Sequence, residues 1–331
     1  MKVKLISMTP NPIDVMWTAA RTCYSAKSPI EMWDDRYGAT SDDCEHTQEY
    51  IDQCIDKHWN LVQKVLSSGH QSIAEHVYFT FAIEGISRAC SHQLVRHRAG
   101  IVFSQQSQRY VEIKEDYHYL EGLHFDLFGP SDDEDKVMNG EKTYDELVAE
   151  EQKLTAEILD VLQNYFVDVN EKNFQPYLQD LLTYLENVHP VLGGMKAEDA
   201  RNVLPNATKT NITMSLNYRE LIHICNLRLC TRAQKEIRDL FKEIVKCVKE
   251  VDERLASYLV PSCEALGVCT EHQSCHRKPT LKEVLESYKL LECDTGLSKD
   301  DWSLLMESIE NPKVNKNLQD LMKMKSVIEE E

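Results

Sequence analysis

Residues 76–97 read HVYFTFAIEGISRACSHQLVRH, a strand pattern followed directly by a helix pattern. Apolar and polar side chains alternate from His76 to Glu84, and this period of two predicts a strand. Gly85 is expected to end that strand, and Ser87 is placed to cap a helix running through Arg88–His97. A strand joined so closely to a helix indicates a fold that contains both kinds of layer.

The same mixture continues on both sides of this stretch. Alternating side chains predict further strands at residues 2–7 and Lys209–Leu216. Apolar side chains at helical spacing predict helices over Val15–Arg21, Glu49–Leu66, Leu147–Phe166, 177–187, Glu198–Leu204, Tyr218–Leu227 and Ala233–Leu259. Residues 29–48 and 127–142 are polar and aperiodic and are expected to be loops. The fold class that follows is α/β of the α+β type, with helices flanking a mixed sheet.

The character of the chain changes after Pro261. Residues 261–280 contain three cysteines and two histidines, and residues 281–331 have the pattern of charged helices. We therefore expect residues 1–262 to form one domain. Residues 263–331 would then be a Cys/His-containing linker and a helical C-terminal extension.

Composition excludes several classes of function. The 331-residue chain has 37 basic and 55 acidic residues, and a net charge of −18 argues against a nucleic-acid-binding face. No apolar run approaches the roughly 18 residues of a membrane-spanning helix, and the N-terminus lacks the pattern of a signal peptide. An odd count of 11 cysteines without such a signal predicts reduced thiols and a cytoplasmic protein.

The most unusual segment is Arg96–Tyr110, RHRAGIVFSQQSQRY. Cations at Arg96–Arg98 are also typical of an ordinary helix C-terminus, whose partial charge is negative. That interpretation leaves the uncharged, hydrogen-bonding run after them unexplained. Arginine, serine and glutamine together suit a phosphate and the edge of a base. The segment therefore predicts a nucleotide or phosphate site.

Two further polar clusters support this prediction. His70–His76 (HQSIAEH) directly precedes the predicted strand, where loops often carry function. Asn217, Arg219, His223 and Arg228 lie along one predicted helix, with Arg219 and His223 four residues apart. Such a stripe either faces solvent or lines a pocket.

These segments together resemble the flavin-dependent thymidylate synthases. That family's signature has Arg-His-Arg, a seven-residue spacer and Ser-x-Arg-Tyr, whereas eight residues separate Arg98 from Ser107 here. The segments that are similar to other family motifs are His70–His76, Gln93, Ala197–Pro205 and Asn217–Gln234. The resemblance covers about residues 1–262.

The resemblance implies a thymidylate synthase-complementing-protein-like fold and a methyltransferase reaction. FAD, reduced by NADPH, would supply the hydride, and 5,10-methylenetetrahydrofolate would supply the methylene group that converts dUMP to dTMP. No enzyme cysteine attacks the pyrimidine in this family. The resemblance also implies a homotetramer whose sites are shared between subunits, without nucleic-acid or membrane partners.

Carried over by position, the resemblance assigns roles to particular residues. The catalytic residues would be Arg228, against the uracil N3/O2 edge, and His70, near the flavin and folate. Those expected to bind FAD are Ser72, Arg96, His97, Arg98, Gln105, Asn217, Tyr218, Arg219 and His223. Those expected to bind dUMP are Gln93, Arg96, Gln105, Gln106, Ser107, Gln108, Arg109, Arg201 and Arg228.

Two alternatives remain at this point. A non-catalytic nucleotide- or flavin-binding regulatory protein would keep the same pocket without turnover. The residues that could hold zinc in the C-terminal segment are Cys263, Cys269, Cys275, His272 and His276. Their five-residue cysteine gaps differ from those of structural zinc sites, so no metal is expected.

Overall fold

The computed structural model of this chain describes residues 1–38, 47–113, 117–128, 139, 142–188 and 193–290. These residues form two compact units. The first unit contains Met1–Lys2, Ile83–Arg96 and Phe103–Thr213, and the second contains Val3–Ala82, His97–Val102 and the chain from Met214 onward.

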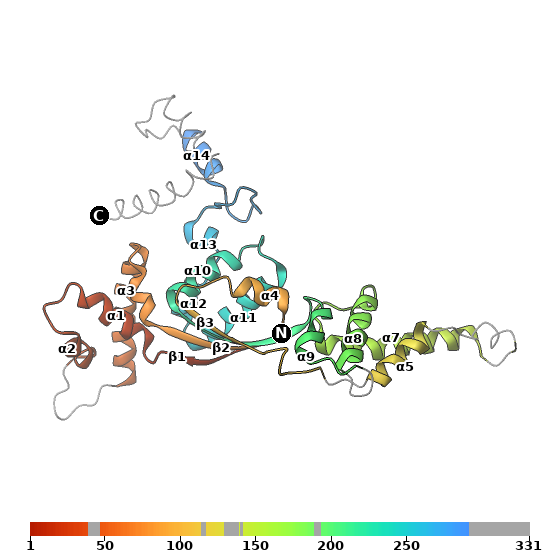
Figure 1. The fold of residues 1–331 in the computed structure, drawn as a ribbon. Helices are drawn as coiled ribbons and strands as arrows, with labels where there is room; N and C mark the ends of the chain where they lie inside the picture. Colours follow the sequence, from red (N-terminus) through yellow and green to blue (C-terminus); the bar gives the residue numbers. More distant parts are fainter. Residues whose placement is uncertain (39–46, 114–116, 129–138, 140–141, 189–192, 291–331) are drawn as a thin grey trace. The chain divides into compact units, whose positions relative to one another are not determined.

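One four-stranded sheet runs in the order β1 (Lys2–Met8), β2 (Tyr78–Ser87), β4 (Lys209–Asn217) and β3 (Ile101–Gln105). Figure 1 labels three of these strands, β1, β2 and β3. The pairings run antiparallel. The Thr80 hydroxyl of β2 lies 2.9 Å from the Ser215 hydroxyl of β4. Further along β2, Gly85 pairs with Asn211, which comes before Ser215 in β4, so these two strands run in opposite directions. The α+β class with flanking helices is confirmed, and the sheet is antiparallel at these pairings where we expected a mixed one. Side-chain alternation predicts strands but does not determine their direction.

Two details of the sheet differ from the sequence-based expectation. β2 does not end at Gly85, because glycine adopts a φ of +72° there and its N–H donates to the Asn211 side chain at 3.1 Å. The chain therefore bends without losing the strand, which continues to Ser87. β3 was not predicted, because its five residues lead straight into the polar run of the signature.

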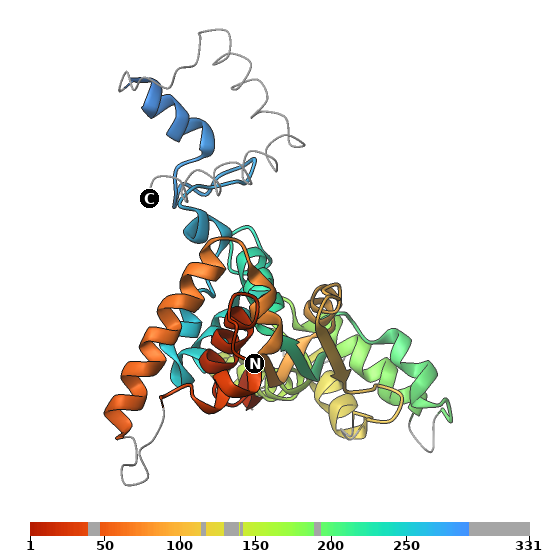
Figure 2. The ribbon, with the colours of Figure 1, turned by 90° about the vertical axis from the view of Figure 1, so that its left-hand side faces the viewer.

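The first unit carries its own helical core. Helices α5 (Tyr117–Phe128), α7 (Tyr144–Tyr165) and α8 (Phe174–Val188) lie side by side (Figures 1 and 2). Their shared apolar side chains include Leu120, Ile158, Leu162, Leu178 and Leu181. The expected helices at 147–166 and 177–187 are confirmed, whereas α5 was not predicted. Most of the expected loop at 127–142 lies outside the described residues.

Short helices complete the first unit. α4 (Arg88–Leu94) begins at the predicted cap, where the Ser87 side chain accepts from the Cys90 N–H, but it ends three residues earlier than expected. The predicted helix at 198–204 is present as α9 (Ala197–Ala200) followed by the 3₁₀ turn η2 (Arg201–Val203).

The second unit contains the remaining helices. Its described helical elements are α1 (Pro12–Thr22), α2 (Pro29–Asp34), α3 (Gln48–Ser67), the 3₁₀ turn η1 (Gln71–His76), α10 (Tyr218–Arg228), α11 (Lys235–Val251), α12 (Glu253–Ala256), α13 (Ser262–Leu266) and α14 (Leu281–Leu290). α1 packs against α3, which Figure 2 shows as the long orange helix. α10 packs against η1.

Two helices here correct the sequence-based expectation. Residues 29–34 are helical rather than a loop, because Ser28 and Glu31 form a capping box and Pro29 occupies the first turn. The single helix expected at 233–259 is interrupted after Val251. Asp252 is extended there, with a φ of −155°, and its side chain caps α12. Of the expected helices at 281–331, the residues beyond 290 lie outside the described part.

A buried carboxylate ties α1 to α3. Asp14 is 1% exposed, and its Oδ1 lies 2.8 Å from Nδ1 of His58 while its Oδ2 accepts from the Tyr37 hydroxyl. Burial by itself raises the pKa of the Asp14 carboxyl, but the hydrogen bonds from His58 and Tyr37 hold that pKa below its usual value. Within the described chain, the helices are all too short or too polar to cross a bilayer.

Candidate functional site

The predicted site residues fall into two sets that follow the two units. The first unit holds Gln93, Arg96, Gln105, Gln106, Ser107, Gln108, Arg109 and Arg201. The second unit holds His70, Ser72, His97, Arg98, Asn217, Tyr218, Arg219, His223 and Arg228. Most residues expected to bind dUMP thus belong to one unit, and most of those expected to bind FAD belong to the other.

The first unit brings two guanidinium groups together. Nη2 of Arg88 donates to Oε1 of Gln108 at 3.0 Å. Burial lowers the pKa of Arg88, and the positive charge of Arg201 lowers it further. Within the described residues, neither arginine forms an ion pair with a carboxylate. Two cations without a counter-charge raise the free energy of the site, which a bound anion would lower.

The glutamine run divides between two faces of β3 and its extension. Nε2 of Gln105 donates to the Ser91 hydroxyl at 2.9 Å and to the Thr210 hydroxyl at 3.3 Å. Gln106 points the other way, and its Oε1 accepts from Nδ2 of Asn211 at 3.0 Å. Strand alternation therefore separates these two neighbours.

Ser107 and Arg109 follow directly. The Ser107 hydroxyl accepts from the Arg109 N–H at 3.1 Å, and the Arg109 guanidinium pairs with Glu198 at 2.7 Å. Both Arg109 and Glu198 remain nearly half exposed, so this ion pair is accessible to a competing anion.

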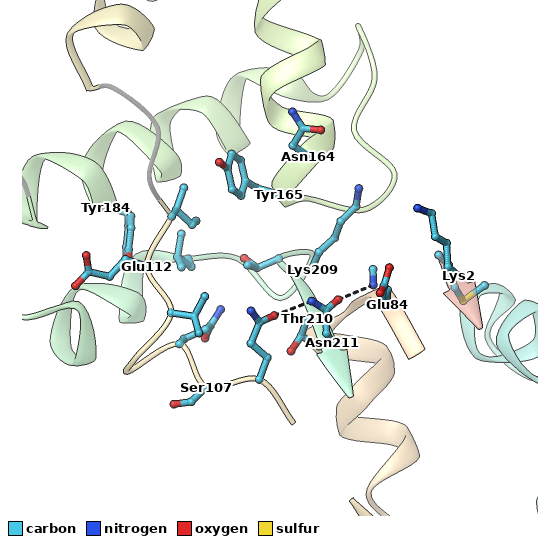
Figure 3. A pocket seen from close by; sticks show the side chains of 18 residues that line it. Lys2, Glu84, Ser107, Glu112, Asn164, Tyr165, Tyr184, Lys209, Thr210 and Asn211 are labelled. Atoms are coloured by element: carbon cyan, nitrogen blue, oxygen red, sulfur yellow. Dashed lines mark hydrogen bonds between the residues drawn. The ribbon is translucent and has the colours of Figure 1, made fainter. Parts of the chain in front are cut away.

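A cavity of about 390 Å³ lies on the Gln106 side of this unit (Figure 3). In Figure 3, Lys209, Thr210 and Asn211 come from β4, whereas Tyr165 and Tyr184 come from α7 and α8. Of the predicted dUMP-binding residues, Gln106, Ser107 and Gln108 line it. The remaining members of that set do not.

In the second unit, the start of α10 is held against the signature segment. The Asn217 side-chain oxygen accepts from the Glu220 N–H at 2.8 Å, and the Asn217 backbone N–H donates to the Gly100 carbonyl at 2.9 Å. Gly100 has a φ of +62°, and a Cβ there would lie 2.8 Å from Cγ of Asn217. Only glycine fits this approach. Asn217 is 8% exposed, so its side chain serves as a helix cap.

Tyr218 lies in the core of this unit. It is fully buried, its hydroxyl donates to the Leu255 carbonyl at 2.7 Å, and its ring lies 5.9 Å from that of Phe79. The Tyr218 side chain therefore packs in the core of this unit, at the first residue of α10.

Arg228, at the end of α10, is hydrogen-bonded to a histidine of the signature. Its Nε donates to Nε2 of His97 at 3.1 Å. Nδ1 of His97 lies 3.7 Å from a carboxylate oxygen of Glu220, and the ring of His223 stands edge-on to it at 6.4 Å. Burial, helped by the charge of Arg228, lowers the pKa of His97 to about 4. At neutral pH the imidazole is uncharged, with its proton on Nδ1.

The other residues of the second set are exposed and polar. His70 and Ser72 lie at the start of η1, and Arg219 pairs with Glu75 of the same turn. The Arg98 side chain is exposed and has no hydrogen bond or ion pair with the described residues. Cations and hydroxyls of this kind fit the diphosphate of a dinucleotide.

Comparisons with known proteins identify the family. The profile described as "Thymidylate synthase complementing protein" matches residues 4–252. The chain belongs to this family. Flavin-dependent thymidylate synthases of Clostridium tetani and Geobacter sulfurreducens are 34% and 35% identical to it. These alignments cover 86% and 82% of the chain, and 96% and 91% of the relatives.

A solved structure shares the fold of this family. Flavin-dependent thymidylate synthase ThyX from Helicobacter pylori, complexed with FAD and dUMP, aligns over 78% of this chain and 100% of its own length. The TM-score is 0.52 at 23% identity. The predicted thymidylate synthase-complementing-protein-like fold is thereby confirmed.

The two thiols on the helices that carry predicted site residues are buried. The first unit contains one cysteine, Cys90, which is buried. Cys225 on α10 is fully buried, and burial raises the pKa of its thiol far above the ordinary value. Within the described residues, no three His, Cys, Asp or Glu side chains are placed to hold a metal.

Two residues of the site were missed by sequence reasoning. Arg88 occupies the first turn of α4, where the helix dipole disfavours a cation, and that misplaced charge was a usable signal for an anion. Glu220 is an acidic residue that is only 8% exposed within a mostly apolar helix. Its significance appears only when His97 is placed beside it.

Proposed function

We propose that this protein converts dUMP to dTMP, with 5,10-methylenetetrahydrofolate as methylene donor and FAD, reduced by NADPH, as hydride donor. Membership of the thymidylate synthase complementing protein family supports this reaction. The observation that carries the proposal is the pair of guanidinium groups at Arg88 and Arg201, which lack a carboxylate partner among the described residues. A nucleoside monophosphate supplies the dianion that such a pair requires.

The dUMP phosphate binds in the first unit. Arg88 and Arg201 contribute charge, and Gln108 is already oriented by Arg88. Arg109 exchanges its exposed partner Glu198 for the phosphate. The other expected nucleotide contacts are Gln93, Arg96, Gln105, Gln106 and Ser107. Arg88 is added here to the set expected from the sequence.

Arg228 acts on the pyrimidine. Its guanidinium stays charged at any working pH, so it stabilises the N3 anion without titrating itself. A fixed donor beside a developing negative charge lowers a barrier by roughly 3 kcal/mol. No thiol is assigned to C6 of the pyrimidine, as the family resemblance implies.

FAD binds along the exposed polar residues of the second unit. Ser72, Arg98, Arg219 and His223 hold it, together with Arg96 and Gln105, and His70 lies near the flavin ring and the folate. When bound, FAD carries the hydride from NADPH to the methylene group. Asn217 and Tyr218 stabilise the start of α10, Asn217 as its N-cap and Tyr218 through its contacts in the core.

The same proposal includes the domain boundaries, the subunit assembly and the cellular location. Residues 1–262 form the catalytic domain, with 263–331 as an extension. Four subunits assemble and share sites, and the enzyme works in the cytoplasm. Sedimentation of the purified protein tests the assembly, since a monomer with full activity would contradict shared sites.

The reaction is tested by product analysis. The purified full-length protein should carry FAD, lose its flavin absorbance when NADPH is added without oxygen, and form dTMP once dUMP and methylenetetrahydrofolate are present. A protein that binds FAD and dUMP but forms no dTMP would instead be the non-catalytic regulatory protein. Omission of each substrate in turn is the control.

A further inference from the structure

The Arg228 side chain is anchored through one of its three nitrogens. Nε donates to His97, and within the described residues Nη1 and Nη2 make no hydrogen bond or ion pair. An unanchored arginine has about 2 kcal/mol of rotamer entropy to lose when it binds a ligand. Fixing Nε removes part of that loss and leaves the outer edge of the guanidinium available for bidentate contact with a ligand.

A carboxylate lies on the other side of the His97 ring. Its Nδ1 faces the Glu220 carboxylate at 3.7 Å, and it is 9% exposed. Glu220 and Arg228 belong to the first and last turns of the same helix, α10. The imidazole therefore lies between two side chains of one helix, and its hydrogen bond is to Arg228.

An imidazole suits this position better than a carboxylate would. A carboxylate acceptor would neutralise the guanidinium and weaken its attraction for an anion, whereas an uncharged acceptor leaves the full positive charge in place. Burial and the Arg228 charge keep His97 in the accepting form at neutral pH, because they lower its pKa to about 4.

We propose that His97 is a positioning residue that acts through Arg228, accepting a hydrogen bond at Nε2 so that the guanidinium edge meets the N3/O2 edge of the pyrimidine. This inference rests on the proposed function. It departs from the role that the family resemblance implies for His97, which is binding of FAD.

The test compares two amides of matched polarity. In His97→Gln the amide oxygen takes the place of Nε2 and still reaches Arg228, whereas in His97→Asn it takes the place of Nδ1 and falls short. We expect His97→Gln to keep kcat within about threefold of the unaltered holoenzyme, and His97→Asn to lose about tenfold in kcat with little change in the KM for dUMP. His272→Gln, an exposed histidine of the same unit, is the control.

A readout without turnover uses 5-fluoro-dUMP bound to the oxidised holoenzyme. Its ¹⁹F chemical shift reports ionisation at N3. His97→Asn should raise the pH of that ionisation by about one unit, which is the same tenfold effect, and His97→Gln should not. Equal behaviour of the two variants would overturn the proposal.

A second comparison distinguishes failure of the His97 proposal from failure of the proposed role of Arg228. In an Arg228→Ala background, His97→Asn should change kcat by less than about twofold, because the residue through which it acts is gone. Loss of FAD absorbance or a further tenfold loss in that background would mean that His97 acts on the flavin or the fold, and the proposal fails. Full activity of Arg228→Ala alone would contradict the proposed role of Arg228 itself.

Discussion

Gly100 lies against the side chain of Asn217 so closely that a Cβ on residue 100 would stand 2.8 Å from Cγ of Asn217. The contact joins the end of the Arg-His-Arg segment to the cap of α10. One backbone position therefore determines how the segment bearing Arg98 meets the helix bearing Arg228.

Gly100→Ala should destabilise the protein by about 2 to 4 kcal/mol, since it adds a clash to a left-handed backbone. Gly69→Ala is the matched control: its φ is +85°, but nothing lies within 4 Å of the added Cβ, so about 1 kcal/mol is expected. Urea unfolding measures both. Equal losses would show that the Asn217 contact is unimportant.

Arg88→Gln should weaken dUMP binding by about tenfold or more, because one of two phosphate-binding charges is removed. Binding of deoxyuridine, which has no phosphate, should change little. Calorimetric titration of both ligands into the oxidised holoenzyme measures the difference. A similar loss for the two ligands would move Arg88 away from the phosphate.

Arg228→Ala should weaken dUMP binding and slow dTMP formation by about a hundredfold, the cost of one fixed donor at a developing anion. Arg228→Lys should recover little, because the planar fork is lost although the charge remains. FAD content and NADPH oxidation without dUMP should stay near normal. Loss of the flavin in Arg228→Ala would place this residue in the cofactor site.

The pKa of His97, about 4 against an ordinary 6.5, makes stability depend on pH. Between these values the unfolded chain binds a proton that the folded protein does not. The contribution of the uncharged imidazole to the free energy of unfolding is therefore complete above pH 6.5 and is lost as the pH falls toward 4. The loss is at most about 3 kcal/mol.

Urea unfolding at pH 7, 5.5 and 4 tests this dependence. His97→Gln should show a flatter pH profile, since glutamine does not titrate. The groups that face His97, namely Arg228, His223 and Glu220, are present in both proteins, so the difference isolates the imidazole. Parallel profiles would contradict the lowered pKa.

Local pattern was sufficient for several elements, although it missed α2, whose capping box is also local. The alternation at Val77–Ile83 predicts β2, the apolar spacing predicts α7, and Ser87 and Asn217 are recognisable caps, because these signals involve residues within a few positions of one another. The order of the family motifs likewise led to the site residues that we propose, apart from Arg88 and Glu220.

Tertiary structure decided what depends on residues far apart in the chain. Gly85 stays within β2 because Asn211 satisfies its N–H, and the short β3 forms because β4 offers it an edge. The charge of Arg201 acts on Arg88, and His97 accepts a hydrogen bond from Arg228, 131 positions later. Charge, burial and hydrogen-bond partners act through space, so the composition of a segment does not contain them.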